Sequence, residues 1–166
     1  ASSTCVTSRP AEAALVTAGS FSAMILGAAA CLTGTNRSRV DALPHPTWGK
    51  RECLTQKAHR FDYDRAYRAA GMTMVDVETK EQLINALCER TAMLAVLASV
   101  ERNAKPGVLL PQEFVEIGRK AGVPVLIDAA SELPPESVLT RYTTMGADLV
   151  VVSGGKGLEG PQSTGI

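Results

Sequence analysis

The chain has 166 residues, 45% of them hydrophobic, a length and composition that suit one globular domain with its own core. Seventeen Lys and Arg balance seventeen Asp and Glu, so the net charge is zero. A neutral chain has no long-range field that would gather nucleic acid or an anionic membrane. Any RNA-binding surface would therefore have to be local.

The four cysteines are widely spaced and form no C-x-x-C pair: Cys5, Cys31, Cys53 and Cys88. This spacing favours reduced thiols buried in the core of a cytoplasmic protein over a disulfide or zinc framework, so no metal site is expected. The most apolar segment runs from Ser20 to Gly34. At about 15 residues it is shorter than the roughly 20 needed to span a bilayer, and we expect a core helix.

Apolar periodicity and helix-breaking residues predict helices and strands in alternation. The predicted helices span residues 20–32, 62–70, 79–89, 111–120 and 135–145. The predicted strands span residues 53–56, 72–77, 91–99, 124–130 and 147–153, and a further strand should start at the final STGI. Thr79 is expected to start a helix, and Asp62 or a neighbour is the expected N-cap of the helix at 62–70. Asp62 and Asp64 look like helix-start residues, not like a metal pair.

This order predicts an α/β fold with three layers, in which helices cover both faces of a mostly parallel sheet. Right-handed crossovers place the carboxyl ends of the strands on one edge, which is where ligands bind in such sheets. The residues that directly follow strands are therefore the site candidates. They include Asp128, Ser153 to Lys156, and Ser99 to Arg102.

Lys156 stands in a glycine-rich turn, SGGKG, for which two nucleotide-binding interpretations can be tested. Residues 155–160 match G-x-G-x-x-G after a strand, but Pro161 and β-prone residues follow where a dinucleotide-binding turn would open a helix. A P-loop needs Ser or Thr after its lysine, and Gly157 stands there instead. Both interpretations fail on context.

Three features of the predicted edge point to one chemistry. Lys156 offers an amine, and Asp128, in an otherwise apolar run, needs a cationic partner. The helix start at Gly19 and Ser20 favours an anion, to which Ser153 would add a hydroxyl. Pyridoxal phosphate requires such an amine, a carboxylate for its ring cation and a phosphate anchor. Taken singly, these residues have ordinary explanations as a surface lysine, an ion-paired carboxylate and a serine cap.

At these residues the sequence resembles the fold type I pyridoxal-phosphate enzymes, the aspartate aminotransferase superfamily. The stretches VLIDAASELPP, GADLVVVSGGKGLEGPQSTG and QKAHRFDYDRAYRAAG resemble its selenocysteine-synthase-like branch, which includes L-seryl-tRNA(Sec) selenium transferase and D-glucosaminate-6-phosphate ammonia lyase. The similarity runs from about Ala11 to Ile166. It implies that residues 1–166 are part of the large cofactor domain, without an N-terminal segment and the C-terminal small domain.

The resemblance implies a role for each matching residue around the cofactor ring. Lys156 would form the internal aldimine and take part in acid/base catalysis, and Asp128 would pair with the pyridine nitrogen. His59, in KAHR, occupies the place of the ring-stacking residue. Ala130 would lie against the ring.

For the phosphate, the resemblance implies Gly19, Ser20 and Ser153. Arg60 is a candidate for binding a substrate carboxylate or phosphate, with a surface role equally open. The sequence departs from the branch at two places: TAGSFS stands where a smaller-residue run such as TSGAAA is expected, and HRFDYD stands where HRNGYD is expected.

The implied function is that of a pyridoxal-phosphate-dependent lyase, which releases ammonia or eliminates a β-substituent from a small amino acid or amino-sugar acid. A selenium-transferase-like reaction is the alternative, although a neutral chain with no basic stripe does not favour tRNA. A catalytically silent scaffold is a further alternative, against which the presence of both Lys156 and Asp128 counts. We expect a cytoplasmic homodimer or larger homo-oligomer with no membrane or DNA partner.

Overall fold

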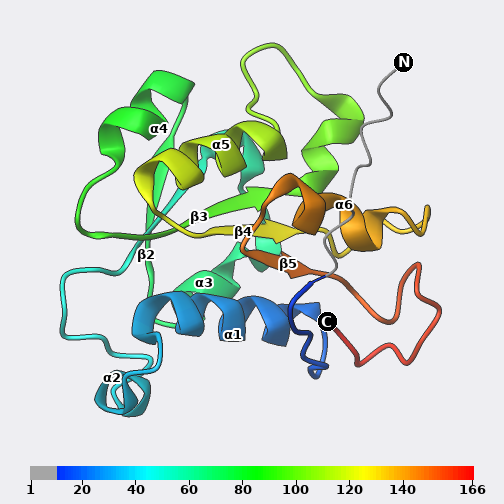
Figure 1. Ribbon diagram of the computed structural model, residues 1–166, viewed down its shortest axis with the longest axis horizontal. Coiled ribbons are helices and arrows are strands. Elements are labelled where there is room, and N and C mark those ends of the chain that lie inside the picture. The colour runs from blue at the N-terminus through cyan, green and yellow to red at the C-terminus, as the bar shows by residue number, and fades with distance from the viewer. Residues whose placement is uncertain (1–10) are drawn as a thin grey trace, which may run out of the picture.

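A computed structural model describes residues 11–166, in which five strands form one parallel sheet of order β2-β1-β3-β4-β5 (Figure 1). The strands are β1 (Glu52–Gln56), β2 (Thr73–Val77), β3 (Thr91–Leu97), β4 (Val125–Asp128) and β5 (Leu149–Val151). Each coincides with a predicted strand, and the predicted α/β class with a parallel sheet is confirmed.

The helices are α1 (Ser20–Thr33), α2 (Arg37–Asp41), α3 (Arg65–Ala69), α4 (Lys80–Ala86), α5 (Pro111–Ala121) and α6 (Val138–Met145), with short 3-10 helices η1 (Lys57–His59), η2 (Asp62–Asp64) and η3 (Ala98–Asn103). Helices α1, α4 and α5 match their predictions within a few residues. The helix predicted at 62–70 is divided between η2 and α3, and the one predicted from 135 starts only at Val138. Neither α2 nor η3 was predicted.

Local sequence explains where these helices begin and end. The hydroxyl of Thr79 accepts the N–H of Gln82 at 3.2 Å, so Thr79 caps α4, at the place where a helix was predicted to start. Helix α5 begins at Pro111. Proline is tolerated there because an N–H in the first turn of a helix has no acceptor within the helix, so its absence costs no hydrogen bond. It ends at Gly122, which has a left-handed φ of 65° that glycine adopts without strain.

The sheet separates two apolar cores (Figure 1), one under α4, α5 and α6 and the other under α1 and α3. Strand β4 shows the alternation, because Val125 and Ile127 pack in the first core and Leu126 packs in the second. Asp128 is the next residue and therefore faces the layer of α1 and α3. The same alternation in β5 places Val151 in the α1 core.

After β5 the chain makes a turn and comes back antiparallel, as a return segment formed by residues 164–166. Val152 and Ile166 exchange two backbone hydrogen bonds of 2.8 and 2.9 Å. On the other side of this segment, Gly165 exchanges two with Thr17, at 2.7 and 3.1 Å. The predicted start of a strand at STGI is thus confirmed as extended, paired backbone, and the end of the described chain lies near the start of α1 (Figure 1).

Three described cysteines carry free thiols, as predicted: Cys53 is buried, Cys31 is partly exposed and Cys88 is exposed. The expectation of burial therefore holds for Cys53 alone, and Cys5 lies outside the described residues. Within residues 11–166, no helix is both long and apolar enough to cross a membrane.

The buried side chain of Gln56 fixes the loop that crosses the carboxyl edge of the sheet. Its amide nitrogen donates to the carbonyl oxygens of Glu78 and Gly107 at 2.8 and 2.7 Å, and its amide oxygen accepts the N–H of Leu109 at 2.8 Å. Gln56 is only 2% exposed, so no water replaces these bonds. One side chain thus holds three backbone groups from two connecting segments.

We expect Gln56→Met to lower the free energy of unfolding by about 3 kcal/mol, because three buried backbone groups lose their partner while the side-chain volume is nearly kept. Urea unfolding with an unchanged m-value measures this loss. Gln112→Met is the matched control, since Gln112 lies exposed on α5 and bonds only Glu116. Equal midpoints for Gln56→Met and the parent chain would contradict the assignment.

Candidate active site

Asp128 is a buried carboxylate at the carboxyl end of the sheet. It is 4% exposed, and its Oδ1 accepts the N–H of Ala130 at 2.9 Å, whereas Oδ2 takes no hydrogen bond from a described residue. Burial raises the pKa of Asp128, and the bond from Ala130 and the positive charge of Lys156 act in the opposite direction. The carboxylate therefore has an acceptor atom available for a cationic partner.

Lys156 lies in an exposed turn whose glycines are held by neighbouring backbone. A side chain on Gly154 would overlap Thr164 of the return segment, and one on Gly157 would overlap the carbonyl of Leu133. Neither glycine has a left-handed φ, so backbone conformation does not require glycine at these positions. Glycine is required because Thr164 and Leu133 lie too close for a side chain. Leu133 belongs to the loop that follows Asp128, which fixes the lysine turn against that loop.

The three residues predicted to hold a phosphate meet at Gly165. Gly19 has a left-handed φ of 100° and precedes α1 without a side-chain cap, which leaves N–H groups of the first turn free for an anion. Gly165 packs against the backbone of Gly19 and Ser20 on one side and pairs with Ser153 on the other. Ser153 is 7% exposed, and its hydroxyl bonds no described residue.

His59 is buried on the other side of the sheet from Asp128. Its Nδ1 accepts the N–H of Leu97 at 3.1 Å, so Nε2 carries the proton and donates to the carbonyl of Leu109 at 2.9 Å. Its ring meets the edge of Phe114 in α5, with centroids 5.1 Å apart, and only 2% of the residue is exposed. Ring stacking by His59 stays a prediction.

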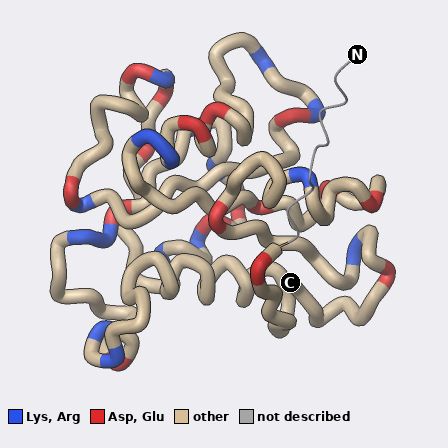
Figure 2. Tube along the Cα trace, viewed as in Figure 1, with Lys and Arg blue, Asp and Glu red and all other residues tan. Residues whose placement is uncertain are grey.

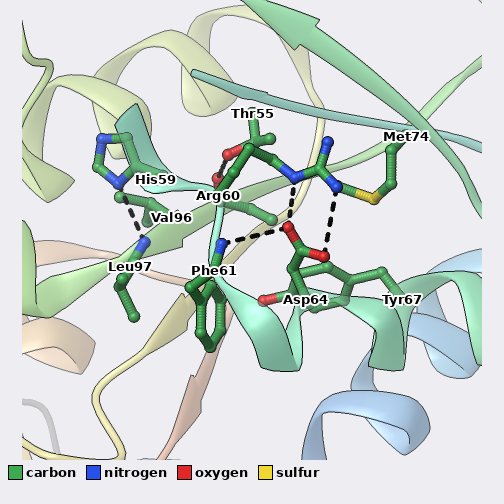
Figure 3. A pocket seen from close by; sticks show the side chains of 10 residues that line it. Thr55, His59, Arg60, Phe61, Asp64, Tyr67, Met74, Val96 and Leu97 are labelled. Carbon is green, nitrogen blue, oxygen red and sulfur yellow. Dashed lines mark hydrogen bonds and ion pairs between the residues drawn. The ribbon is translucent and has the colours of Figure 1, made fainter. Parts of the chain in front are cut away.

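Arg60 is held by two carboxylates, of which Figure 3 shows that of Asp64. Its guanidinium forms an ion pair with Asp64 and donates to Asp76 at 2.7 Å. These bonds raise the pKa of Arg60, that to Asp64 most. The carboxylate of Asp64 also accepts the N–H of Phe61 at 3.4 Å, which supports its predicted role at a helix start. A substrate anion at Arg60 would have to compete with both partners, so the geometry favours a structural role.

Tyr67 is a site neighbour that sequence reasoning missed. It lies in α3, is 2% exposed, and borders a cavity of about 10 Å³, enough for one water molecule (Figure 3). Burial and the nearby charge of Asp128 raise the pKa of Tyr67 well above its usual value. In the sequence Tyr67 looks like an ordinary apolar position of an amphipathic helix, so no signal distinguished it.

The described residues contain no cluster of histidine, cysteine and carboxylate side chains that could hold a metal ion. What they do bring together at one edge of a parallel sheet is a buried carboxylate, a lysine turn and an uncapped helix start. This combination of fold and edge residues resembles the cofactor domain of fold type I pyridoxal-phosphate enzymes.

Comparison with known proteins finds three relatives with related sequences. The chain is 36% identical over 163 residues to a Streptomyces sp. protein named 5'-C-glycyluridine monooxygenase-decarboxylase, covering 92% of this chain. It is 29% identical over 162 residues to D-glucosaminate-6-phosphate ammonia lyase of Salmonella typhimurium, covering 92% of this chain, and 27% identical over 157 residues to L-seryl-tRNA(Sec) selenium transferase of Mannheimia succiniciproducens, covering 81%. No family model matches the chain.

Among solved structures, D-glucosaminate-6-phosphate ammonia-lyase superposes with a TM-score of 0.84 at 28% identity, over 96% of this chain and 45% of the other. A rice TDC solved with PLP and tryptamine shares the fold alone, with a TM-score of 0.64 at 12% identity, over 91% of this chain and 36% of the other. The resemblance predicted from the sequence is thereby confirmed. The chain covers only 40%, 42% and 34% of the three curated relatives.

Gly165→Ala should lower the free energy of unfolding by about 1–3 kcal/mol, because its methyl group would force the return segment away from Gly19 and Ser20. Urea unfolding measures the loss, and faster amide hydrogen exchange at Thr17 would locate it. Gly49→Ala is the control, since Gly49 has open space around its Cα and no left-handed φ. Equal exchange at Thr17 in Gly165→Ala and the parent would refute the close approach.

His59 should make the stability of the fold depend on pH. Burial lowers its pKa in the folded chain, so the unfolded chain binds a proton more readily, and stability falls as the pH drops below about 6.5. We expect His59→Gln to flatten the dependence of the urea midpoint between about pH 7 and 5, and His45→Gln, at an exposed position, to keep it. The same slope in both variants would exclude His59 as the source.

Proposed function

We propose that this chain binds pyridoxal phosphate and provides the cofactor domain of an enzyme that acts on an amino substrate. The observation that carries the proposal is Asp128, a buried carboxylate with an unpaired Oδ2, on the sheet face that also holds the start of α1. A pyridinium nitrogen is a suitable cationic partner for such a carboxylate. When bound, the cofactor supplies an electron sink for negative charge that develops at the α-carbon of the substrate.

The residues of the edge divide the work between them. Asp128 would hold the proton on the ring nitrogen, and Ala130 would lie against the ring. The N–H groups at Gly19 and Ser20, together with the hydroxyl of Ser153, would bind the phosphate. Lys156 would attach to the cofactor through its Nζ and, once displaced by a substrate amine, would carry a proton to or from the α-carbon.

A lyase reaction on a small amino acid or amino-sugar acid is the outcome we favour. Its support is the ammonia lyase whose solved structure superposes over nearly the whole chain. The relative with 36% identity is named a monooxygenase-decarboxylase, so loss of a carboxylate is a second candidate for the bond that breaks. Both reactions need the same carboxylate, lysine and phosphate cradle, and they differ in which bond of the α-carbon faces away from the ring plane.

A transferase acting on an aminoacyl-tRNA is a further candidate, which the selenium transferase relative supports. The charges argue against it for the part of the chain that the structure describes, since Figure 2 shows Lys and Arg interspersed with Asp and Glu and gathered in no stripe. A tRNA-binding surface needs such a stripe.

The chain, residues 1–166, would be part of the large domain of a longer enzyme, as its coverage of about two fifths of its relatives suggests. That enzyme would work as a homodimer or larger homo-oligomer. The free thiols of Cys31, Cys53 and Cys88 fit a reducing compartment, and we assign the protein to the cytoplasm.

Addition of pyridoxal phosphate should give a yellow species that absorbs near about 410–430 nm and that borohydride fixes on one lysine. Peptide mass spectrometry should place the fixed group on Lys156. Lys156→Ala should abolish the fixation, whereas Asp128→Asn should keep it and weaken cofactor affinity about tenfold, because the ring cation loses its charged partner.

Lys120→Ala is the matched control for Lys156→Ala, since Lys120 is an exposed lysine at the end of α5. It should bind and fix the cofactor as the parent does. The longest version of the protein that can be produced is the fair test, because the chain covers less than half of its relatives. A protein of that kind that stays colourless, or that is fixed on Lys120, would overturn the proposal.

A further inference from the structure

The five residues that follow Asp128 form a loop, residues 129–133, that touches both halves of the proposed site. Its second residue, Ala130, donates its N–H to Oδ1 of Asp128 at 2.9 Å. The carbonyl of its last residue, Leu133, lies so close to Gly157 in the lysine turn that a side chain there would overlap it. The position of this Asp128 loop therefore governs both the carboxylate and the lysine turn.

Backbone hydrogen bonds hold the first part of the Asp128 loop. The N–H of Ala129 donates to the carbonyl of Val151 in β5 at 2.9 Å, and the N–H of Glu132 donates back to the carbonyl of Ala129 at 3.1 Å. Beyond the loop, the chain is exposed from Pro134 to Ser137. A loop that leads directly into an exposed stretch keeps one conformation only if another element anchors it.

Arg102 supplies such an anchor from η3, the 3-10 helix that directly follows β3 at the carboxyl edge of the sheet. Its Nη2 donates to the carbonyl oxygen of Ser131. The same nitrogen lies 2.7 Å from Oε1 of Glu132 and 3.3 Å from the hydroxyl of Ser131, and that hydroxyl donates to Glu132 at 3.2 Å. One guanidinium therefore holds the backbone and two side chains in the middle of the Asp128 loop.

Helix η3 is itself fixed to the rest of the fold. Leu97, the residue before it, pairs with Asp128 in the sheet. Glu101, the neighbour of Arg102, accepts the hydroxyl of Tyr142 in α6 at 2.9 Å, and Tyr142 is completely buried. Because η3 is tied to β3 and to α6, the bonds of Arg102 hold the loop against a rigid part of the molecule.

Arg102 also balances a charge that opposes the charge of Asp128. The side chain of Glu132 is only 9% exposed, so water screens its charge poorly. Burial and the negative charge of Glu132 raise the pKa of Asp128, and the positive charge of Lys156 lowers it. Tyr67 is a further titratable group near this carboxylate. Pairing with Arg102 reduces the repulsion between the two carboxylates.

We propose that Arg102 is a positioning residue of the proposed active site. Through Ser131 and Glu132 it fixes the Asp128 loop, so that the carboxylate and the lysine turn keep their mutual positions. It also offsets the negative charge of Glu132 beside Asp128. This proposal rests on the proposed function, because it presumes that Asp128 and Lys156 serve the cofactor. Arg102 acts through the loop and takes no part in the bond-breaking step.

Measurements without the cofactor test the anchor and the charge separately. Arg102→Met removes the charge and the donors but keeps an unbranched side chain. It should speed amide hydrogen exchange at Ala130, and it should raise the pKa of Asp128, followed by NMR of the carboxyl carbon. When Arg102→Met is combined with Glu132→Gln, both charges are gone. The pKa of Asp128 should then return toward that of the parent, while exchange at Ala130 stays fast.

Two single variants serve as comparisons. Arg102→Lys keeps the charge without the planar fork, so it should leave the pKa of Asp128 closer to that of the parent than Arg102→Met does. Arg90→Met is the matched control, since Arg90 precedes β3, pairs with Glu52 at 2.6 Å and is about as exposed as Arg102. It should change neither exchange at Ala130 nor the pKa of Asp128. Urea unfolding would verify that every variant is folded.

The proposal is overturned if Arg102→Met shows the exchange of the parent at Ala130 or the pKa of the parent at Asp128. Equal changes in Arg90→Met and Arg102→Met would also overturn it, because they would show a general loss of stability and no specific link through the Asp128 loop.

Binding experiments separate this proposal from the one on which it rests. Arg102→Met should weaken pyridoxal phosphate binding about tenfold in absorbance titrations, because binding must then order the loop. Inorganic phosphate, whose proposed cradle does not include the loop, should bind within about twofold of the parent. If borohydride fixes the cofactor on Lys156 of the parent but Arg102→Met retains its affinity, the positioning proposal fails and the proposed function stands. If the parent binds no pyridoxal phosphate, both fail.

Discussion

The site depends on a contact that no side chain can enter. Gly165 lies with one side against the backbone of Gly19 and Ser20 and pairs on the other side with Ser153. Because it has no Cβ, the start of α1 and the end of β5, which form the proposed phosphate cradle, can approach each other closely. The turn that carries Lys156 is anchored to the same return segment through Gly154 and Thr164. Close backbone packing therefore sets the distance between the phosphate cradle and the lysine.

The two faces of the sheet serve different purposes at the carboxyl edge. The α1 and α3 side holds Asp128 and Tyr67, whereas the α5 side holds His59 and Gln56, whose polar side-chain atoms are all engaged with backbone. This division follows from strand alternation, which turns successive side chains to opposite faces. The carboxylate of Asp128, which has an acceptor atom without a partner among the described residues, lies on one side. The side chains of Gln56 and His59, which fix the loops, lie on the other.

Apolar periodicity and helix-breaking residues were sufficient to predict the strands and the layer order, since both depend on local patterns. Thr79, Pro111 and Gly122, for example, mark helix ends in the sequence. Periodicity was also sufficient to predict that Asp128 lies at the end of one strand and that Lys156 follows the next; the structure makes Asp128 the last residue of β4. Sequence patterns could not predict which way His59 and Arg60 point, because each side chain has a partner outside its own local segment. Asp76 lies 16 positions from Arg60, and Leu109, the partner of His59 Nε2, lies 50 positions from His59. Helix α2 was missed because four of its five residues are polar and the helix carries no apolar stripe.

The pairing of Thr17 with Gly165 also has a consequence for the order in which the protein forms. These residues are separated by 148 positions, and closing so long a loop is entropically unfavourable until the intervening strands have already folded. During synthesis the phosphate cradle would remain open until almost the whole described chain had emerged. Formation of the proposed phosphate cradle should therefore be a late event on the folding pathway.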